Sequence, residues 1–304
     1  MDDIDIALAS ALQSDGRATL KALSAAVRLS RAATAARVHR LLATGTLRIT
    51  GVVHPFVLGH RELAHVSVDV DGPVAPVARA IAAMASSPFV SMVTGRYGVV
   101  AELRVADRGT LTRTIRDIRS VPGVAGVDTL SYVDVVRDVM GPTGTPTVAP
   151  DLTDLQLLHR LQQDGRSSFA ALGAFVGMSP GAARMRVRRL IDGGVVHVGA
   201  LLRRSTQDRQ SALGIGIRVR GDDRHIVDTL QTVGTVEFTA RTLGRFDIVL
   251  TVRGAYPTDL RETVDRVRSI ADVVSTETWM HLQVLKETYE SKQPIPPTAE
   301  PDHA

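Results

Sequence analysis

The sequence predicts an α+β protein made of two tandem copies of one unit, in which three short helices precede a β-α-β-β-α-β module. Three observations support this prediction: a repeat at constant spacing, an Ala-, Leu- and Arg-rich first third with helical periodicity in each copy, and alternating apolar residues after it. The 304-residue chain is 44% hydrophobic and 22% charged, which is typical of globular proteins with buried cores.

The repeat is most visible in two pentapeptides, Gln13-Ser-Asp-Gly-Arg17 and Gln162-Gln-Asp-Gly-Arg166. Their offset of 149 residues recurs along most of the chain. Other matched pairs are Leu23 and Leu172, Ser30 and Ser179, Arg37 and Arg186, Val66 and Ile215, and Gly95 and Gly244. An offset held for so long indicates a duplication, with each copy repeating the same two modules.

Composition sets the predicted module boundaries. The three-helix modules are assigned to residues 1–50 and 153–200, and the α/β modules to 51–140 and 201–290. Residues 141–152 are rich in Gly, Pro and Thr and are predicted to form a linker. The Pro-containing tail, 291–304, is predicted to be disordered.

The three-helix module is predicted from apolar spacing and from stop and start signals. Ile4, Leu8 and Leu12 recur every four residues and form one apolar helix face. We expect a capping box from Thr153 to Gln156 at the start of the second copy. Glycines after Asp15 and Asp164 are expected to act as left-handed caps at the ends of the first helices.

A third helix follows a short turn in each copy. Ser30 and Ser179 are predicted to cap it, and Pro180 suits its first turn. Two helices, a tight turn and a capped third helix form a winged-type helix-turn-helix, whose last helix enters the major groove of DNA. The stretch from Gly16 to Arg61 contains arginines but no acidic residue, as a phosphate-binding surface requires. A three-helix bundle with a solvated basic face is the alternative interpretation.

Double-stranded DNA is therefore the predicted partner, with separate residues for bases and for phosphates. The base-reading candidates lie on the first turns of the third helices: Ser30, Arg31, Thr34, Ser179, Gly181 and Arg184. The phosphate-binding candidates lie further along the same helices: Arg37, Arg40, Arg186 and Arg189. Because the copies differ at the base-reading positions, they could prefer different half-sites.

The second module is predicted to be ferredoxin-like. Val66, Val68 and Val70 alternate with polar residues, as a half-buried strand requires. Helical and strand patterns then follow in the order β-α-β-β-α-β, the split βαβ unit also found in RAM- and ACT-like sensing domains. Helices cover one sheet face only, so apolar residues such as Trp279 would be left exposed on the other. We therefore expect sheet-to-sheet pairing, within the chain or in a homo-oligomer.

The ordered set of motifs resembles the Lrp/AsnC family, also called feast/famine regulators. The matching residues in the first copy are Asp15-Gly16-Arg17, Leu29-Ser30 and Arg37-Val38-His39-Arg40-Leu41. Those in the second copy are Asp164-Gly165-Arg166, Met178-Ser179 and Arg186-Val187-Arg188-Arg189-Leu190. The resemblance covers nearly the whole chain, twice. It implies a transcription regulator in which one chain corresponds to the dimer of ordinary members, and which assembles further.

The resemblance also implies an amino-acid-like effector, held where sensing modules meet at a Gly-x-x-Asp loop. The second copy keeps this loop, with Gly244, Arg245 and Asp247, whereas the first copy has Gly95 and Gly98 and lacks the acid. The second copy is therefore the preferred effector site. Thr278 and its counterpart Thr129 are expected to present hydroxyl groups to the effector. The alternative interpretation is that both loops are hairpin turns, in which Asp247 only orders the backbone.

Several function classes lack support in the sequence. There is no cysteine, the first residues are acidic rather than basic, and no apolar run could cross a membrane. We expect a cytoplasmic, nucleoid-associated protein without catalytic residues, metal or cofactor. One rival remains from the same architecture, a sirohaem-decarboxylase-like enzyme, for which the histidines are the candidates: His54, His60, His65, His225 and His281. A non-specific architectural DNA-binding protein is the other rival.

Overall fold

A computed structural model describes residues 1–202, 211–254 and 256–288. The predicted tail, 291–304, lies outside these residues. Contacts divide the chain into two compact units, each of which combines parts of both copies. The helical unit takes Met1–Gly59 and Val139–Ser205, and the barrel unit takes His60–Asp138 and Thr206–Thr288, within the described ranges. No helix among the described residues is long and apolar enough to span a membrane.

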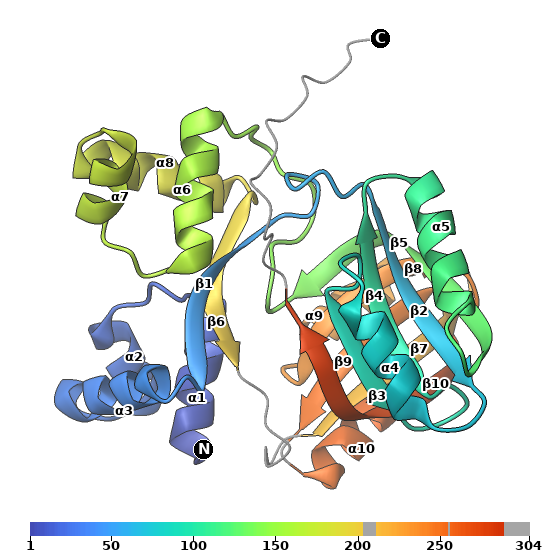
Figure 1. Ribbon diagram of the computed structural model, residues 1–304. Coiled ribbons are helices and arrows are strands. Elements are labelled where there is room, and N and C mark those ends of the chain that lie inside the picture. Colours follow the sequence, from blue (N-terminus) through green and yellow to red (C-terminus); the bar gives the residue numbers. More distant parts are fainter. Residues whose placement is uncertain (203–210, 255, 289–304) are drawn as a thin grey trace. The chain divides into compact units, whose positions relative to one another are not determined.

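The helical unit contains two helix-turn-helix domains, each followed by a strand (Figure 1). The first consists of α1 (Asp3–Ser14), α2 (Leu20–Val27), α3 (Arg31–Ala43) and β1 (Leu47–Val53). The second consists of α6 (Leu152–Gln163), α7 (Phe169–Val176), α8 (Pro180–Asp192) and β6 (Val196–Leu202). The predicted caps Ser30 and Ser179 are confirmed, because each hydroxyl accepts a hydrogen bond from the backbone N–H three residues on.

The first helices begin earlier than predicted. The capping box of α6 is formed by Asp151 and Asp154, so the prediction of Thr153 and Gln156 is wrong. Asp2 and Asp5 form the same box at the start of α1. Both sequence frames satisfy the rule of an acceptor followed by a second one three residues later. The aspartates are used because they place a carboxylate at N3, where the third helix can reach it.

Strands β1 and β6 pair as a two-stranded antiparallel ribbon between the two helix groups (Figure 1). Each first helix of one copy packs on the strand of the other copy, so the two domains share one core. Gly16 and Gly165 make this approach possible. A Cβ atom on Gly16 would lie 2.9 Å from the carbonyl oxygen of Val198, and one on Gly165 would lie 3.0 Å from the backbone of Thr50. Neither glycine has the left-handed conformation predicted for a cap.

Arg17 and Arg166, which follow these glycines, lock the two copies together. Arg17 donates hydrogen bonds to the carbonyl oxygens of Gly165 and Ser167, at 2.6 and 2.9 Å. Arg166 makes the equivalent contacts in the opposite direction, donating hydrogen bonds to the carbonyl oxygens of Gly16 and Ala18 at 2.8 and 2.9 Å. The repeated Asp-Gly-Arg motif is therefore a reciprocal clamp across the ribbon.

The barrel unit contains both ferredoxin-like modules. The first consists of β2 (Glu62–Val70), α4 (Val74–Ala83), β3 (Phe89–Val93), β4 (Val99–Val105), α5 (Arg108–Arg119) and β5 (Val124–Asp138). The second consists of β7 (Ser211–Val219), α9 (Arg224–Gln231), β8 (Val236–Leu243), β9 (Ile248–Gly254), α10 (Pro257–Arg268) and β10 (Val273–Glu287). The observed element order is the predicted one in both copies.

The two sheets join at their edges into one closed barrel. Strand β5 pairs with β8, and β10 pairs with β3, which gives the cyclic order β10-β3-β4-β2-β5-β8-β9-β7. Helices α4 and α5 lie on the outer side of the strands (Figure 1). The sheet faces without helices point inward and form a separate apolar cluster that includes Leu130, Phe246 and Trp279. The expected pairing of the two sheets thus occurs within one chain, by edge closure, which also removes free strand edges.

Candidate DNA interface and ligand cavity

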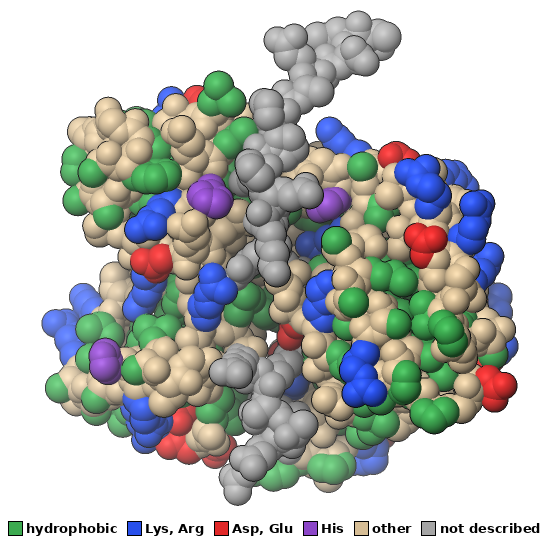
Figure 2. Space-filling view, in the orientation of Figure 1, with side chains coloured by type: hydrophobic (Ala, Val, Ile, Leu, Met, Phe, Trp, Pro, Cys, Tyr) green, Lys and Arg blue, Asp and Glu red, His purple; other side chains and the backbone are tan. Residues whose placement is uncertain are grey.

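Helices α3 and α8 present matching solvent-exposed faces. Their residues at positions i, i+3, i+4 and i+7 lie on one side of the helix. On α3 this stripe is Ala32, Ala35, Ala36 and His39, and on α8 it is Gly181, Arg184, Met185 and Arg188. All but the half-buried Ala35 are exposed. In the space-filling view, Lys and Arg side chains lie at several separate places on the surface of the helical unit, with Asp and Glu side chains beside some of them (Figure 2).

Thr34, one of the base-reading candidates, faces the opposite way. Its exposed fraction is 0%, and its hydroxyl donates to the carbonyl oxygen of Ser30 at 2.9 Å. Its counterpart in the second copy, Ala183, is also buried. The prediction that Thr34 reads bases is therefore wrong, because a side chain packed under the helix cannot reach a groove. Of the other candidates, Arg31, Gly181 and Arg184 are exposed, and the exposed Ser30 and Ser179 are occupied as caps.

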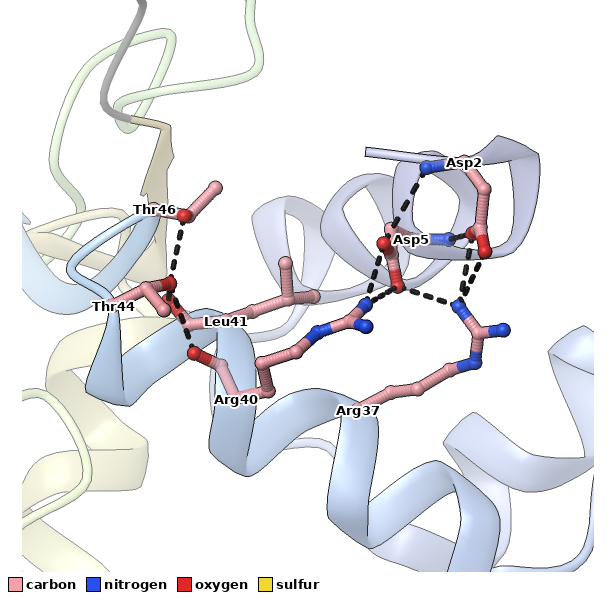
Figure 3. A network of polar contacts seen from close by, with 7 residues as sticks. All are labelled: Asp2, Asp5, Arg37, Arg40, Leu41, Thr44 and Thr46. Carbon is pink, nitrogen blue, oxygen red and sulfur yellow. Dashed lines mark hydrogen bonds and ion pairs between the residues drawn. The ribbon is translucent and has the colours of Figure 1, made fainter.

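The arginines predicted to bind phosphates are held by carboxylates of the first helix (Figure 3). Arg37 contacts Asp2 at 2.7 Å and Asp5 at 2.9 Å, and Arg40 contacts Asp5 at 2.7 Å. Asp5 is only 3% exposed, so its charge depends on these two guanidinium groups. The hydrogen bond from Arg37 holds the pKa of Asp2 below its ordinary value.

The second copy repeats this network. Arg186 contacts Asp151 at 2.7 Å and Asp154 at 2.8 Å, and Arg189 also pairs with Asp154. Asp154 is completely buried. The acid-free stretch around the third helix therefore receives its negative charges from the start of the first helix, which the sequence spacing did not reveal. The structure gives all four arginines a role in holding the third helix, and contact with DNA phosphates remains a prediction for them.

Other arginines on the third helices are exposed and have no carboxylate partner among the described residues. Arg31 on α3, and Arg184 and Arg188 on α8, are exposed and form no ion pair within the part of the chain that the structure describes. Arg188 was not among the predicted site residues. Its signal in the sequence was its place one helical turn after Arg184, which puts both side chains on the same face.

The predicted effector loops meet in the barrel unit. A cavity of about 240 Å³ lies beside the β3–β4 loop of the first copy and β10 of the second. It is lined by two arginines, an acid, three Ser or Thr residues, two aromatic residues and small apolar residues: Arg96, Arg245, Glu277, Ser67, Thr94, Thr278, Tyr97, Trp279, Gly95, Val93 and Val100. Three predicted effector residues are thereby brought together, namely Gly95, Arg245 and Thr278.

Arg245 is fixed in this site by contacts from both copies. Its guanidinium group lies over the rings of Tyr97 and Phe246, at 4.5 and 4.3 Å from their centroids. It pairs with both carboxylate oxygens of Glu277 at 3.0 Å and with Asp128 at 3.1 Å. A guanidinium group stacked and paired in this way is a rigid wall of the cavity.

The Gly-x-x-Asp loop of the second copy packs closely against neighbouring residues, which leaves no space for a ligand beside Gly244. The Asp247 carboxylate accepts a hydrogen bond from the backbone N–H of Val219 at 2.8 Å, so it orders the backbone. Gly244 lies directly against the first copy, and a Cβ atom there would be 2.6 Å from Leu130 Cδ2. In the first copy a Cβ atom on Gly95 would meet nothing within 4 Å. The loop with open space beside it is therefore the one in the first copy, whereas the sequence motif favoured the loop of the second copy as the effector site.

The remaining predicted effector residues do not line the cavity. Gly98 approaches α4 closely, since a Cβ atom would lie 2.8 Å from Val74 Cγ2, which explains why no acid occupies this position. Thr129 pairs with Val66, whose side chain belongs to the core under the helices. Paired residues in an antiparallel ladder share a sheet face, so Thr129 points away from the barrel interior.

His65 is a buried titratable group inside the barrel, 8% exposed, close to Trp279. Burial, assisted by the charge of Arg245, lowers its pKa to about 4. The ring nitrogen Nε2 lies 3.2 Å from the hydroxyl of Ser67, which lines the cavity.

Sequence profiles of known families match both kinds of module. The profile of the AsnC-type helix-turn-helix domain matches residues 1–42 and 151–191, and that of the Lrp/AsnC ligand binding domain matches residues 63–139. The HTH-type transcriptional regulator FL11 of Pyrococcus abyssi is 31% identical over 132 residues, which are 43% of this chain and 87% of that protein. The regulator LysM of Sulfurisphaera tokodaii is 25% identical over 134 residues, which are 44% of this chain and 96% of that protein.

Among solved structures, the siroheme decarboxylase NirDL in complex with an iron-uroporphyrin III analogue has a TM-score of 0.60 and 13% identity. The alignment covers 94% of this chain and 93% of that one. At this identity the likeness shows a shared fold and carries no activity across.

Paired helix-turn-helix domains joined to an α/β ligand-binding module define a class of DNA-binding transcription regulators. Both profiles and the curated relatives place the family more narrowly. The chain belongs to the Lrp/AsnC family of transcriptional regulators, and it carries two copies of the domain pair that its relatives carry once.

Proposed function

We propose that this regulator binds duplex DNA in a sequence-specific manner, and that an amino-acid-like effector in the barrel cavity changes its DNA affinity or its assembly. The observation that carries the DNA part is the pair of capped helices α3 and α8, each with its i, i+3, i+4, i+7 face exposed to solvent. Reading of a major groove requires such an unobstructed first turn.

Phosphate contacts supplement this reading. Arg31 lacks a carboxylate partner among the described residues, so it supplies positive charge that releases counterions from the duplex. Arg184 and Arg188, which also form no ion pair among these residues, project from the face of α8 that would enter the groove. Arg37, Arg40, Arg186 and Arg189 hold the third helix against the start of the first helix, and their charges are largely balanced there by the aspartates. The Ser30 and Ser179 hydroxyls keep the helix N-termini ordered at the groove.

The chemistry of the cavity favours a small zwitterion. Arg96 is exposed at its rim and suits a carboxylate, and Glu277 is 46% exposed and suits an ammonium group. Val93 and the ring of Trp279 offer apolar surface to a side chain. A cavity of about 240 Å³ is smaller than the roughly 300–1,000 Å³ typical for drug-sized ligands, which fits a single amino acid.

Coupling between the cavity and DNA would run through assembly. Glu277 and Trp279 lie on β10, whose other end pairs with β3 to close the barrel. If the pairing of β10 with β3 has two arrangements, an effector that binds one of them more tightly shifts the equilibrium toward it by its differential affinity for the two. In this proposal the protein acts as a homo-oligomer of pseudo-dimeric chains, in the cytoplasm and on the nucleoid.

Genomic footprinting with the purified full-length chain tests the proposal, with and without each amino acid of a panel at fixed salt. Discrete protected sites, and a change in their occupancy by one amino acid, are the expected results. Uniform protection at all sequences would instead identify a non-specific architectural protein. A shift in the visible absorbance bands of a tetrapyrrole on mixing with the protein, without any mobility shift on DNA, would instead favour an enzyme of the sirohaem-decarboxylase type.

A further inference from the structure

The two exposed helix faces have equivalent positions but opposite chemistry. Each begins two residues after its capping serine, and the offset of 149 residues pairs them one to one. In the first copy the face carries three alanines and one histidine: Ala32, Ala35, Ala36 and His39. In the second it carries one glycine, two arginines and one methionine: Gly181, Arg184, Met185 and Arg188.

From this difference we infer that α8 reads the bases while α3 only anchors its half of the protein, so that the operator is asymmetric. This inference rests on the proposed DNA binding and deepens it. One half-site carries base-specific information, and the other is bound through backbone contacts and through DNA shape.

The chemistry of the α8 face supports base reading. An arginine can donate two hydrogen bonds to O6 and N7 of guanine, the commonest specific contact in the major groove. Met185 is apolar, yet its side chain is 74% exposed and no described residue covers it. An apolar contact of this kind suits the methyl group of thymine. Arg184 and Met185 lie in the first turns of α8, which is the part of a recognition helix that contacts base edges.

The intramolecular contacts of α8 separate its arginines into two groups. Arg186 and Arg189 turn toward α6 and pair with the buried Asp154, whereas Arg184 and Arg188 lie on the other face without an ion pair within the described residues. Neutralising the first pair leaves the second as the charged groups that project from the helix. On α3 the same carboxylate network occupies Arg37 and Arg40, and no arginine stands at positions 35 or 39.

Three of the four residues on the exposed face of α3 are alanines and cannot make the equivalent contacts, which leaves His39 as the one member with hydrogen-bonding atoms in its side chain. A methyl side chain has no hydrogen-bond donor or acceptor, and its reach is one carbon from the backbone. Its charged neighbours Lys21 and Arg31 are exposed and suit phosphates, which carry no sequence information.

Duplication within one chain is what permits this division. In a dimer of identical chains both recognition helices are the same, and the operator is a palindrome. Here the two helices belong to one chain, and the β1–β6 ribbon with the Arg17–Arg166 clamp joins their domains in one unit. A chain of this kind binds DNA in one defined orientation.

Selection of bound sequences from a random DNA library by the full-length protein tests the inference. The expected consensus has one strongly specified half-site and a second, weakly specified one. The variant Arg184→Ala/Arg188→Ala should lose about tenfold or more of the discrimination between the selected site and scrambled DNA. The matched control Lys21→Ala/Arg31→Ala removes the same charge from the first copy and should weaken binding to both DNAs equally.

A gain-of-function variant gives a second test that does not depend on a loss of DNA binding or of sequence discrimination. Ala35→Arg/Ala36→Met/His39→Arg places the α8 chemistry on α3, and its selected site should become a near-palindrome. Two equally informative half-sites for the unmodified protein would overturn the inference, as would equal loss of discrimination in the two double variants. Absence of any protein–DNA complex with the unmodified chain would overturn the proposed function itself, and is distinguishable from both.

Discussion

Arg17 and Arg166 each reach across the β1–β6 ribbon and donate hydrogen bonds to the backbone that carries the other. Four carbonyl oxygens are thereby satisfied by two guanidinium groups, one from each copy. Arg17 also lies over the ring of Phe169, 4.5 Å from its centroid, and burial lowers the pKa of its guanidinium group. The two helix-turn-helix domains are consequently expected to unfold as one cooperative unit.

Arg17→Ala should lower the free energy of unfolding by about 2 kcal/mol, because it removes charged hydrogen bonds to two carbonyl groups in a partly buried place. Urea denaturation followed by circular dichroism measures this as a lower midpoint with unchanged slope. Arg31→Ala is the matched control, since this exposed arginine has no ion pair among the described residues. A midpoint equal to that of the control would show that the clamp does not stabilise the unit.

The buried carboxylate of α6 gives a second prediction. Asp154→Asn should destabilise the helical unit by about 3 kcal/mol, because Arg186 and Arg189 lose the charge to which both are bound. Asp151→Asn is the control and should cost less than about 1 kcal/mol, since Asn is an equally good N-cap and the Asp151 side chain is 52% exposed. Thermal unfolding of both variants measures their loss of stability. An equal loss of stability in the two variants would contradict the role assigned to Asp154.

The repeat, the element order and the capped third helices could all be predicted from the sequence, because they depend on local signals. Apolar periodicity and serine caps act within a few residues of the structure they determine. The capping box of α6 was predicted at the wrong residues because two frames in Asp151–Gln156 satisfy the same local rule, and the pairing of Asp154 with Arg186 selects one of them.

Other features depend on contacts that the sequence does not display. Thr34 is polar and lies on the helix expected in the groove, yet packing of α3 on α1 and α2 turns it inward. The cavity combines Gly95 with Glu277 and Trp279, which lie more than 180 residues further along the sequence. Closure of the barrel brings them together, and strand alternation alone does not distinguish an open sheet from a closed one.

His65 predicts how the barrel responds to acid. Its pKa is about 4 in the folded protein and 6.5 for the free side chain, so the unfolded chain binds the proton more readily between these values. Stability is therefore complete above pH 6.5 and falls as the pH drops toward 4. A shift of this size corresponds to about 3 kcal/mol.

His65→Gln, which retains a polar partner for Ser67, should remove most of this dependence between pH 4 and 6.5. A smaller dependence of the same sign should remain from His60, whose pKa is also lowered by burial. Chemical denaturation at several pH values measures the slope, and the exposed His39 provides the control His39→Gln, which should keep the slope of the unmodified protein. A slope in His65→Gln equal to that of the unmodified protein would assign the titration to another group.

The cavity gives the last prediction, because it separates the two candidate effector loops. Glu277→Gln removes the carboxylate that faces the cavity and should weaken binding of the effector amino acid about tenfold or more, since a charge-assisted hydrogen bond becomes a neutral one. Asp247→Asn keeps an oxygen that can accept from Val219 and should leave effector affinity unchanged. Isothermal titration of each variant with the amino acid identified by footprinting measures both. If Asp247→Asn abolishes binding while Glu277→Gln does not, the effector occupies the loop of the second copy. In that case Leu130 would have to move away from Gly244, because the two are packed too closely to admit a ligand between them.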